Sequence, residues 1–247
     1  MLDAKSEQAI AEAVGHLRAR FGARLVTVSL YGSGVGPDFV PGVSDLNLVV
    51  VLDVLGVDDL QVLHPDIARW RKQGIATPLI IDREFLRDAT DVFPMELEEI
   101  RDQHRPLHGT DVFATLAIRR DNLRYQCEHE ARGKLLRLEG LSLEVGGDPK
   151  ALQRLMLDSL KTFLIVMRNV NRLVGVHEPG SYVTVLPAFM RYFRRDFPLM
   201  ARLLRIKLGH DPWIDDVDAT FRAYVGEVRQ LVEFIDQLPA DGRATAS

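Results

Sequence analysis

Four residues near the start of the chain have the types and the spacing that phosphate and metal chemistry requires. Gly32 and Ser33 follow directly after an apolar, β-branched run, and eleven residues separate Ser33 from Asp45, which with Asn47 opens a second such run. A glycine lets the backbone approach a ligand closely, and a serine hydroxyl with nearby amides can donate hydrogen bonds to phosphate oxygens. Side chains alternate across a strand, so Asp45 and Asn47 share one face. The spacing predicts a phosphate-binding loop beside two oxygen ligands for a cation.

The hydrophobic pattern indicates the elements that position these residues, because helices and strands repeat their apolar residues at different periods. In the first part of the chain, helices are expected at 4–21 and 58–73, and strands at 25–31, 46–52, 77–81 and 93–100. Beyond residue 111 only helices are expected, at 115–140, 149–174, 182–194, 197–208 and 215–238. We therefore predict an α+β fold, with a small mixed-sheet domain at 1–111 and an all-α helical bundle at 112–247 that serves a substrate or a partner.

Composition excludes several classes of protein. The single cysteine, Cys127, allows no intramolecular disulfide, and no apolar run approaches the roughly 20 residues that a membrane helix needs. A cytoplasmic protein without a membrane partner is therefore expected. The net charge of −4 combines an acidic segment 1–111, a basic segment 112–210 and an acidic remainder. This asymmetry suits a cation site followed by a phosphate site, but solvated helix faces of varying sign are the preferred explanation.

The segment 31–52 resembles the nucleotidyltransferase superfamily that includes DNA polymerase β and the kanamycin nucleotidyltransferase-type resistance enzymes. Their signature is a Gly-Ser pair at a strand end, a loop of this length, and Asp-x-Asp or Asp-x-Glu on the next strand, as in Gly32-Ser33 and Asp45-Leu46-Asn47. The resemblance implies an enzyme that transfers a nucleoside monophosphate from a nucleoside triphosphate, with ATP as the first choice, to an acceptor hydroxyl. It also implies two Mg²⁺ ions held by carboxylates.

The resemblance requires a third carboxylate on a later strand, and Glu96 in the run 93–100 is the first candidate, with Glu98 as the alternative. The expected metal ligands and catalytic residues are then Asp45, Asn47 and Glu96, with Gly32 and Ser33 binding the nucleotide. Asn47 departs from the signature because its neutral amide replaces an acid. Losing one carboxylate weakens the clamp on the charges that develop during the reaction.

This departure leaves other hypotheses open. The chain is either a nucleotidyltransferase or a catalytically degenerate protein that binds a nucleotide or a partner on the same scaffold. A third reading is the antitoxin-like half of a regulatory pair. The acceptor, a small molecule or a protein, and the oligomeric state are not determined by the sequence. A nucleic-acid partner is not expected, because aromatic residues are sparse in the basic segment.

The helical half offers further candidates. The resemblance implies that its bundle supplies a basic side chain for the triphosphate and an acidic general base, and Lys134 and Glu130 lie four residues apart on one helix face. An ordinary intrahelical salt bridge is the competing interpretation. Lys161, Arg168 and Arg172 also share a face, which we expect to be a solvated stripe. His104 and His108 receive no role.

Overall fold

The computed structural model describes the chain except for residues 1, 37–38, 41, 43, 178–180 and 240–247. The chain divides into two compact units, Met1–Arg119 and Arg120–Ser247. The sequence placed the boundary after Asp111, so the first unit extends eight residues further than expected. The extra segment belongs to the first unit because Phe113 is fully buried in the core against the sheet.

The first unit is built on a four-stranded mixed sheet with the order β3-β2-β1-β4. The strands are β1 (Leu25–Tyr31), β2 (Asn47–Leu52), β3 (Leu79–Asp82) and β4 (His104–Gly109). Strand β1 is antiparallel to both β2 and β4, whereas β2 and β3 are parallel and are connected through a helix. The two central strands are almost entirely buried, as expected for apolar runs covered on both faces.

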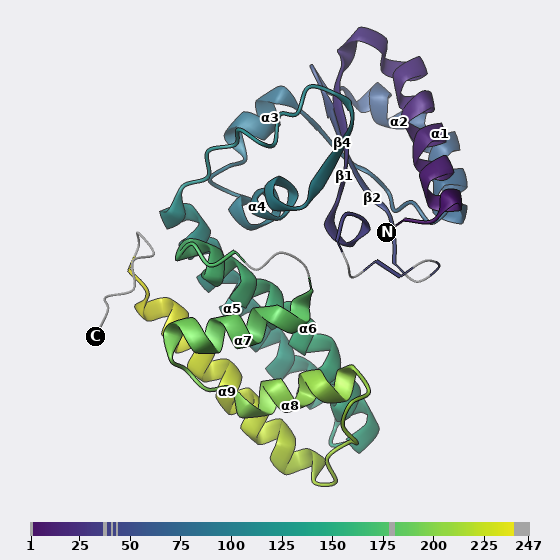
Figure 1. Cartoon of the computed structure of the whole chain (residues 1–247). Helices are drawn as coiled ribbons and strands as arrows, with labels where there is room; N and C mark the ends of the chain where they lie inside the picture. Colours follow the sequence, from purple (N-terminus) through teal and green to yellow (C-terminus); the bar gives the residue numbers. More distant parts are fainter. Residues whose placement is uncertain (1, 37–38, 41, 43, 178–180, 240–247) are drawn as a thin grey trace. The chain divides into compact units, whose positions relative to one another are not determined.

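Helices cover both faces of this sheet (Figure 1). On one face, α1 (Ala4–Phe21) and α2 (Val57–Lys72) enclose alternate residues of β2, beginning with Leu48. On the other face, α3 (Arg83–Asp88) and α4 (Pro94–Asp102) pack against the intervening residues, beginning with Val49. Asn47 has the same parity as Val49, so its side chain belongs to the α3–α4 face.

The predicted strand 93–100 is wrong, because this segment forms α4. Pro94 occupies the first turn, where its missing N–H costs nothing, and Glu96 and Arg101 place charges of the favourable sign at the two helix ends. The fourth strand is instead β4, which contains Pro106 and is only partly buried. Proline and partial burial are typical of an edge strand. Because β4 contains no continuous apolar run, the sequence did not reveal it as a strand.

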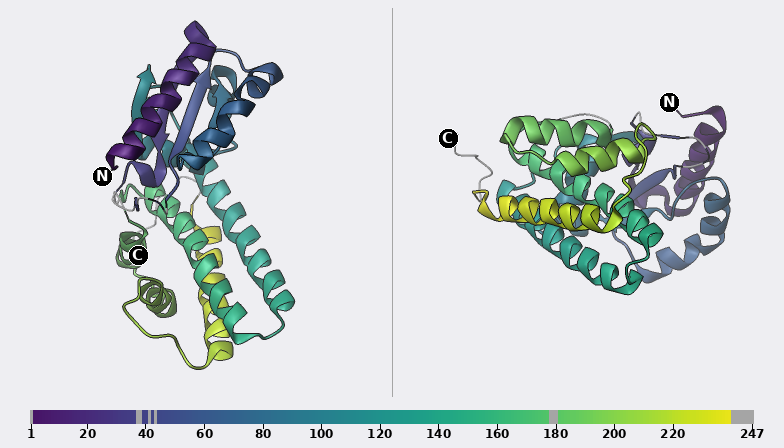
Figure 2. Two further views of the ribbon diagram at one scale, coloured as in Figure 1. Left: turned by 90° about the vertical axis from the view of Figure 1, so that its right-hand side faces the viewer. Right: turned by 90° about the horizontal axis from the view of Figure 1, so that it is seen from below.

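Among its described residues, the second unit contains helices and their connections and no strand. Its helices are α5 (Arg120–Val145), α6 (Pro149–Leu173), α7 (Tyr182–Phe193), α8 (Pro198–Lys207) and α9 (Val217–Gln237). They agree with the expected spans except that α5 begins and ends five residues later. Helices α5, α6 and α9 contact one another along the unit, and α7 and α8 pack on α6 (Figure 2).

A buried arginine joins the first and last helices of this unit. Arg124, near the start of α5, donates hydrogen bonds to the backbone carbonyls of Asp236 and Leu238 at the end of α9, at 2.5 and 3.0 Å. The start of α5 therefore lies against the end of α9, and the two helices are antiparallel. No helix among the described residues is long and apolar enough to cross a membrane.

Candidate nucleotide-binding site

The Gly32-Ser33 segment forms a tight turn at the end of β1. Residues Gly32–Gly34 make one turn of 3₁₀ helix, closed by a hydrogen bond from the Val35 amide to the Gly32 carbonyl at 3.0 Å. Gly32 has φ +71°, which other L-residues rarely adopt, and its N–H donates to the carbonyl of Gln103 at 3.1 Å. The strand therefore ends at this turn, which places the half-buried Ser33 at the end of the sheet. Of the loop that follows, residues 37–38, 41 and 43 lie outside the described residues.

The turn lies directly beside the start of β2. Tyr31 pairs with Asn47 in the β1–β2 ladder, and a Cβ placed on Gly32 would lie 3.5 Å from the Asn47 side-chain nitrogen. Asp45 is exposed two residues earlier, and the intervening Leu46 is buried at 1% exposure. The structure thus brings the Gly-Ser turn, Asp45 and Asn47 together at one end of the sheet.

The β4 register adds an unexpected residue to this end. Tyr31 pairs with Asn47 on one side and with His104 on the other. Directly opposite residues of antiparallel strands project to the same face, so these three side chains form a row across the sheet. Burial raises the pKa of the central Tyr31. The sequence noted His104 without a role, because placing it in this row requires knowing that β4 is a strand.

His104 is held by two acceptors. Its Nδ1 lies 3.1 Å from the carbonyl of Arg101, at the end of α4, and its Nε2 lies 2.9 Å from a carboxylate oxygen of Asp111. Burial by itself would raise the pKa of Asp111, but hydrogen bonds from the Ala114 amide, His104 and the Phe113 amide outweigh it and lower that pKa. The pair therefore ties α4, β4 and the following segment together.

The predicted third carboxylate does not come from a strand. Glu96 is exposed in the first turn of α4, and Glu98 is 5% exposed and forms an ion pair with Arg101 of the same helix. Residues two apart on a helix point in different directions, so Glu96 and Glu98 do not share the face expected of a strand. On the other side of β2, the neighbouring segment 76–78 contributes the exposed Thr77 rather than an acid.

Asp45 and Asn47 are the side chains at this end of the sheet that could hold a cation. Asp45 and Asn47 provide the oxygen ligands that Mg²⁺ prefers. Nowhere in the described part of the chain do three or more His, Cys, Asp or Glu side chains form a group that could hold a metal ion. At this end of the sheet, Asp45 is the acidic side chain among the described residues. The neighbouring strand ends contribute Thr77, Asn47, Tyr31 and His104.

The basic candidates of the second unit have partners of their own. Lys134 forms an ion pair with Glu130 on the next turn of α5, as the competing interpretation anticipated, and its role in binding the triphosphate stays a prediction. The solvated stripe predicted on α6 is confirmed at the exposed Lys161 but is wrong for the two arginines. Arg168 and Arg172 are buried at 5% and 8% exposure, and the Arg168 guanidinium lies 4.2 Å from the centre of the Tyr182 ring.

Comparison with known proteins adds evidence at the level of the fold. The structure is similar to that of spectinomycin adenyltransferase AAD(9) from Enterococcus faecialis, crystallised with ATP and spectinomycin. The TM-score is 0.56 over 90% of this chain and 99% of that one, at 13% sequence identity. The chain therefore shares the fold of this adenyltransferase. No family model matches the sequence, and a search of curated proteins finds no match.

This similarity agrees with the fold that the resemblance of segment 31–52 implies, and it confirms the α+β class. It also explains why a small mixed sheet precedes a set of helices in this chain. At 13% identity the similarity carries no residue roles, so the assignments of Gly32, Ser33, Asp45, Asn47 and Glu96 rest on the geometry described above.

Proposed function

We propose that the chain binds a nucleoside triphosphate, ATP in the first instance, and transfers its nucleoside monophosphate to an acceptor hydroxyl. The observation that supports this most directly is the contact between the Gly32 turn and Asn47, with Asp45 exposed beside them. It joins donors for phosphate to oxygen ligands for a cation, in the fold of an adenyltransferase crystallised with ATP.

Each residue has a distinct part in this proposal. Gly32 makes the turn, and the Ser33 hydroxyl and the amides of the turn donate to phosphate oxygens. Asp45 and Asn47 hold one Mg²⁺, which when bound offsets negative charge on the phosphates. Glu96 is the proposed third ligand, but it must reach the nucleotide from the first turn of α4.

A nucleotide-binding protein without turnover is the second candidate, and a specific observation favours it. Asn47 carries no charge, and neither of the neighbouring strand ends replaces the missing acid, since they offer Thr77 and His104. Under this alternative the same turn binds ATP without turnover. Binding then stabilises the ATP-bound state of the chain, or of its complex with a partner.

The first experiment measures ATP binding and pyrophosphate release by the full chain with Mg²⁺, using spectinomycin as the first acceptor probe. Asp45→Ala should abolish both the metal dependence of ATP binding and any release. Asp53→Ala is the matched control, because Asp53 follows the far end of β2 and pairs with the exposed Arg83. Equal losses in the two variants would contradict the proposed site.

Asn47→Asp separates the two candidates. If the chain is a transferase, wild type releases pyrophosphate with a suitable acceptor, and the added carboxylate changes the rate. If wild type binds ATP without turnover over a panel of hydroxyl acceptors and Asn47→Asp gains turnover, the transferase proposal is wrong and the binding protein stands.

A further inference from the structure

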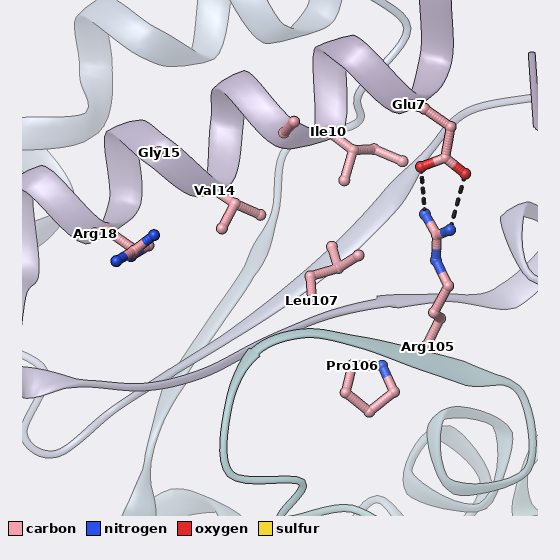
Figure 3. Close-up of a pocket in the computed structure, with 9 residues that line it drawn as sticks. Glu7, Ile10, Val14, Gly15, Arg18, Arg105, Pro106 and Leu107 are labelled. Carbon is pink, nitrogen blue, oxygen red and sulfur yellow. Dashed lines mark hydrogen bonds and ion pairs between the residues drawn. The ribbon is translucent and has the colours of Figure 1, made fainter. Parts of the chain in front are cut away.

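A groove runs along the first unit between α1 and the edge strand β4, away from the row described above. Its cavity volume is about 390 Å³. Figure 3 shows apolar side chains of α1 and β4 in the middle, Arg18 towards one end, and the ion pair between Glu7 and Arg105 at the other. The strand contributes Pro106 and Leu107 to its wall.

The α1 wall of this groove is one stripe of the helix. Its members follow the helical spacing of three and four residues: Glu7, Ile10, Ala11, Val14, Gly15 and Arg18. Ile10 turns into the core at 2% exposure, whereas Ala11 and Gly15 are exposed and Val14 is half-buried. A Cβ on Gly15 would meet no atom within 4 Å, so the helix surface is open at this point.

The charges at the two ends of the stripe are opposite. Arg105 donates two hydrogen bonds to the Glu7 carboxylate at 2.8 and 2.9 Å, and these bonds lower the pKa of Glu7. The Glu7 side chain nevertheless remains 45% exposed, and a carboxylate has lone pairs for further donors. At the opposite end, Arg18 has no ion-pair partner in the described part of the chain.

This stripe is complementary to itself under a twofold rotation. If two α1 helices lie antiparallel, with the axis at the level of Glu12 and Ala13, residue 7 of each copy faces residue 18 of the other. The same rotation places Val14 opposite Ala11, and the open surface at Gly15 opposite the turn that carries Ile10. Opposite charges then meet at both ends and Val14 meets the smaller Ala11 between them, as an isologous interface requires.

We propose that this surface is a homodimer interface, in which α1 of a second copy packs antiparallel into the groove between α1 and β4. The Glu7 carboxylate is then shared between Arg105 of its own chain and Arg18 of the second copy. Pro106 and Leu107 extend the apolar contact from the strand. This inference is independent of the proposed nucleotide site.

A second copy explains the stripe better than another occupant does. A nucleic acid or an anionic membrane would require charge of one sign along the groove, whereas this stripe has an acid at one end and a base at the other. A single helix stripe with a flanking strand lies at the small end of stable interfaces. We therefore expect a dissociation constant on the order of 1–100 µM.

Sedimentation velocity over a concentration series of the full chain tests the proposal. Wild type should shift from monomer to dimer within the stated range. Arg18→Glu and Glu7→Arg should each weaken the dimer at least about 10-fold, because both symmetry-related pairs become repulsive. A mixture of the two variants should form a heterodimer near wild-type affinity, since each copy then supplies the charge that the other lacks.

The mixture makes the test specific, because a purely structural role of either residue predicts no rescue. High salt should weaken the rescue, since exposed pairs are screened. A wild type that stays monomeric to about 100 µM, single variants that remain dimeric, or a mixture that does not associate would each overturn the proposal.

Replacing Glu7 also breaks its hydrogen bonds to Arg105 within the monomer. A variant that changes no charge therefore gives a second test of the interface. Gly15→Gln raises helix propensity and meets nothing within the monomer, so the monomer should be as stable as wild type or more so. It should nevertheless weaken the dimer at least about 10-fold by filling the open surface. Gly133→Gln is the matched control on α5, with equally open space around it, and should leave the association unchanged. Equal dimer affinity in the two variants would contradict the interface.

Discussion

Two carboxylates associated with opposite faces of the sheet, Asp66 and Asp45, have opposite environments. On the α1–α2 face, the buried carboxylate of Asp66 accepts hydrogen bonds from Arg20 and Arg69 and lies 3.1 Å from the Nδ1 atom of His16. On the α3–α4 face, the row of Asn47, Tyr31 and His104 ends beside the exposed Asp45. A carboxylate whose lone pairs are already used can only stabilise the fold, whereas an exposed one at a strand end remains available to a ligand.

Both carboxylate oxygens of Asp66 are already used in hydrogen bonds within the fold. Burial alone would raise the pKa of this carboxyl, but hydrogen bonds from His16 and Arg20 outweigh the burial and lower it. Arg20 donates at 2.7 Å and Arg69 at 3.0 Å, so both carboxylate oxygens have cationic partners. The comparison therefore predicts that loss of Asp66 affects stability and loss of Asp45 affects ligand binding.

The largest expected effect is on stability. Asp66→Ala leaves two arginines and a histidine at the α1–α2 contact without their shared anion. Because these three side chains are 34–44% exposed and water can solvate them, the loss should be about 1–3 kcal/mol. Urea unfolding should show this loss, while ATP affinity of the folded fraction stays at the wild-type value. A stability loss below about 1 kcal/mol would mean that the network is dispensable.

Asp45→Ala should have the converse effect. Turnover should fall at least about 10²-fold, the loss typical when a group that stabilises charge in a reaction is removed. The free energy of unfolding should change by no more than about 0.5 kcal/mol, because the side chain is exposed. If Asp45→Ala instead unfolds the chain, the distinction between the two faces is wrong.

A smaller effect concerns pH. The folded state lowers the pKa of Asp111 from its ordinary value of 3.8, so its contribution to stability is present above that value and is lost as pH falls through the lowered pKa. Asp111→Asn should therefore be less stable than wild type at pH 6, and the difference should shrink below pH 3.8. Unfolding curves across this range measure it, and a difference that grows on acidification would contradict the assignment.

The smallest effect is expected at Lys134. Its partly exposed ion pair with Glu130 contributes about 0.3–0.5 kcal/mol, so Lys134→Met should leave stability nearly unchanged. ATP affinity then decides its function. An unchanged affinity favours the plain salt bridge, and a loss of about 10-fold or more supports the predicted contact with the triphosphate.

Local patterns predicted the fold well where one element produced one clear signal. The bounds of α1 and β1 agree with the expected spans, and the motif around Gly32 and Asp45 identified the nucleotidyltransferase fold. The prediction failed where one segment carried conflicting local signals. The segment 93–100 has apolar residues that suit a strand, but Pro94 and the end charges favour the helix that the structure shows.

The sequence predicted only those residues of the candidate site that lie close together in the chain. Gly32, Ser33, Asp45 and Asn47 lie close together because one connection joins two paired strands. The place of His104 depends on a β1–β4 register between residues more than seventy positions apart, and the edge strand that carries it has no apolar run. The burial of Arg168 is likewise a tertiary effect, since a helix stripe of cations is normally solvated.

The clamp that Arg124 forms has a consequence for motion in the second unit. Terminal turns of helices usually fray first, each at its own rate. Here the carbonyls of Asp236 and Leu238 at the end of α9 accept hydrogen bonds from Arg124 near the start of α5. Neither helix end can therefore open without leaving buried polar groups of the other end unpaired. Hydrogen exchange should accordingly show slow, correlated opening at two ends of the helical unit that lie more than a hundred residues apart in the chain.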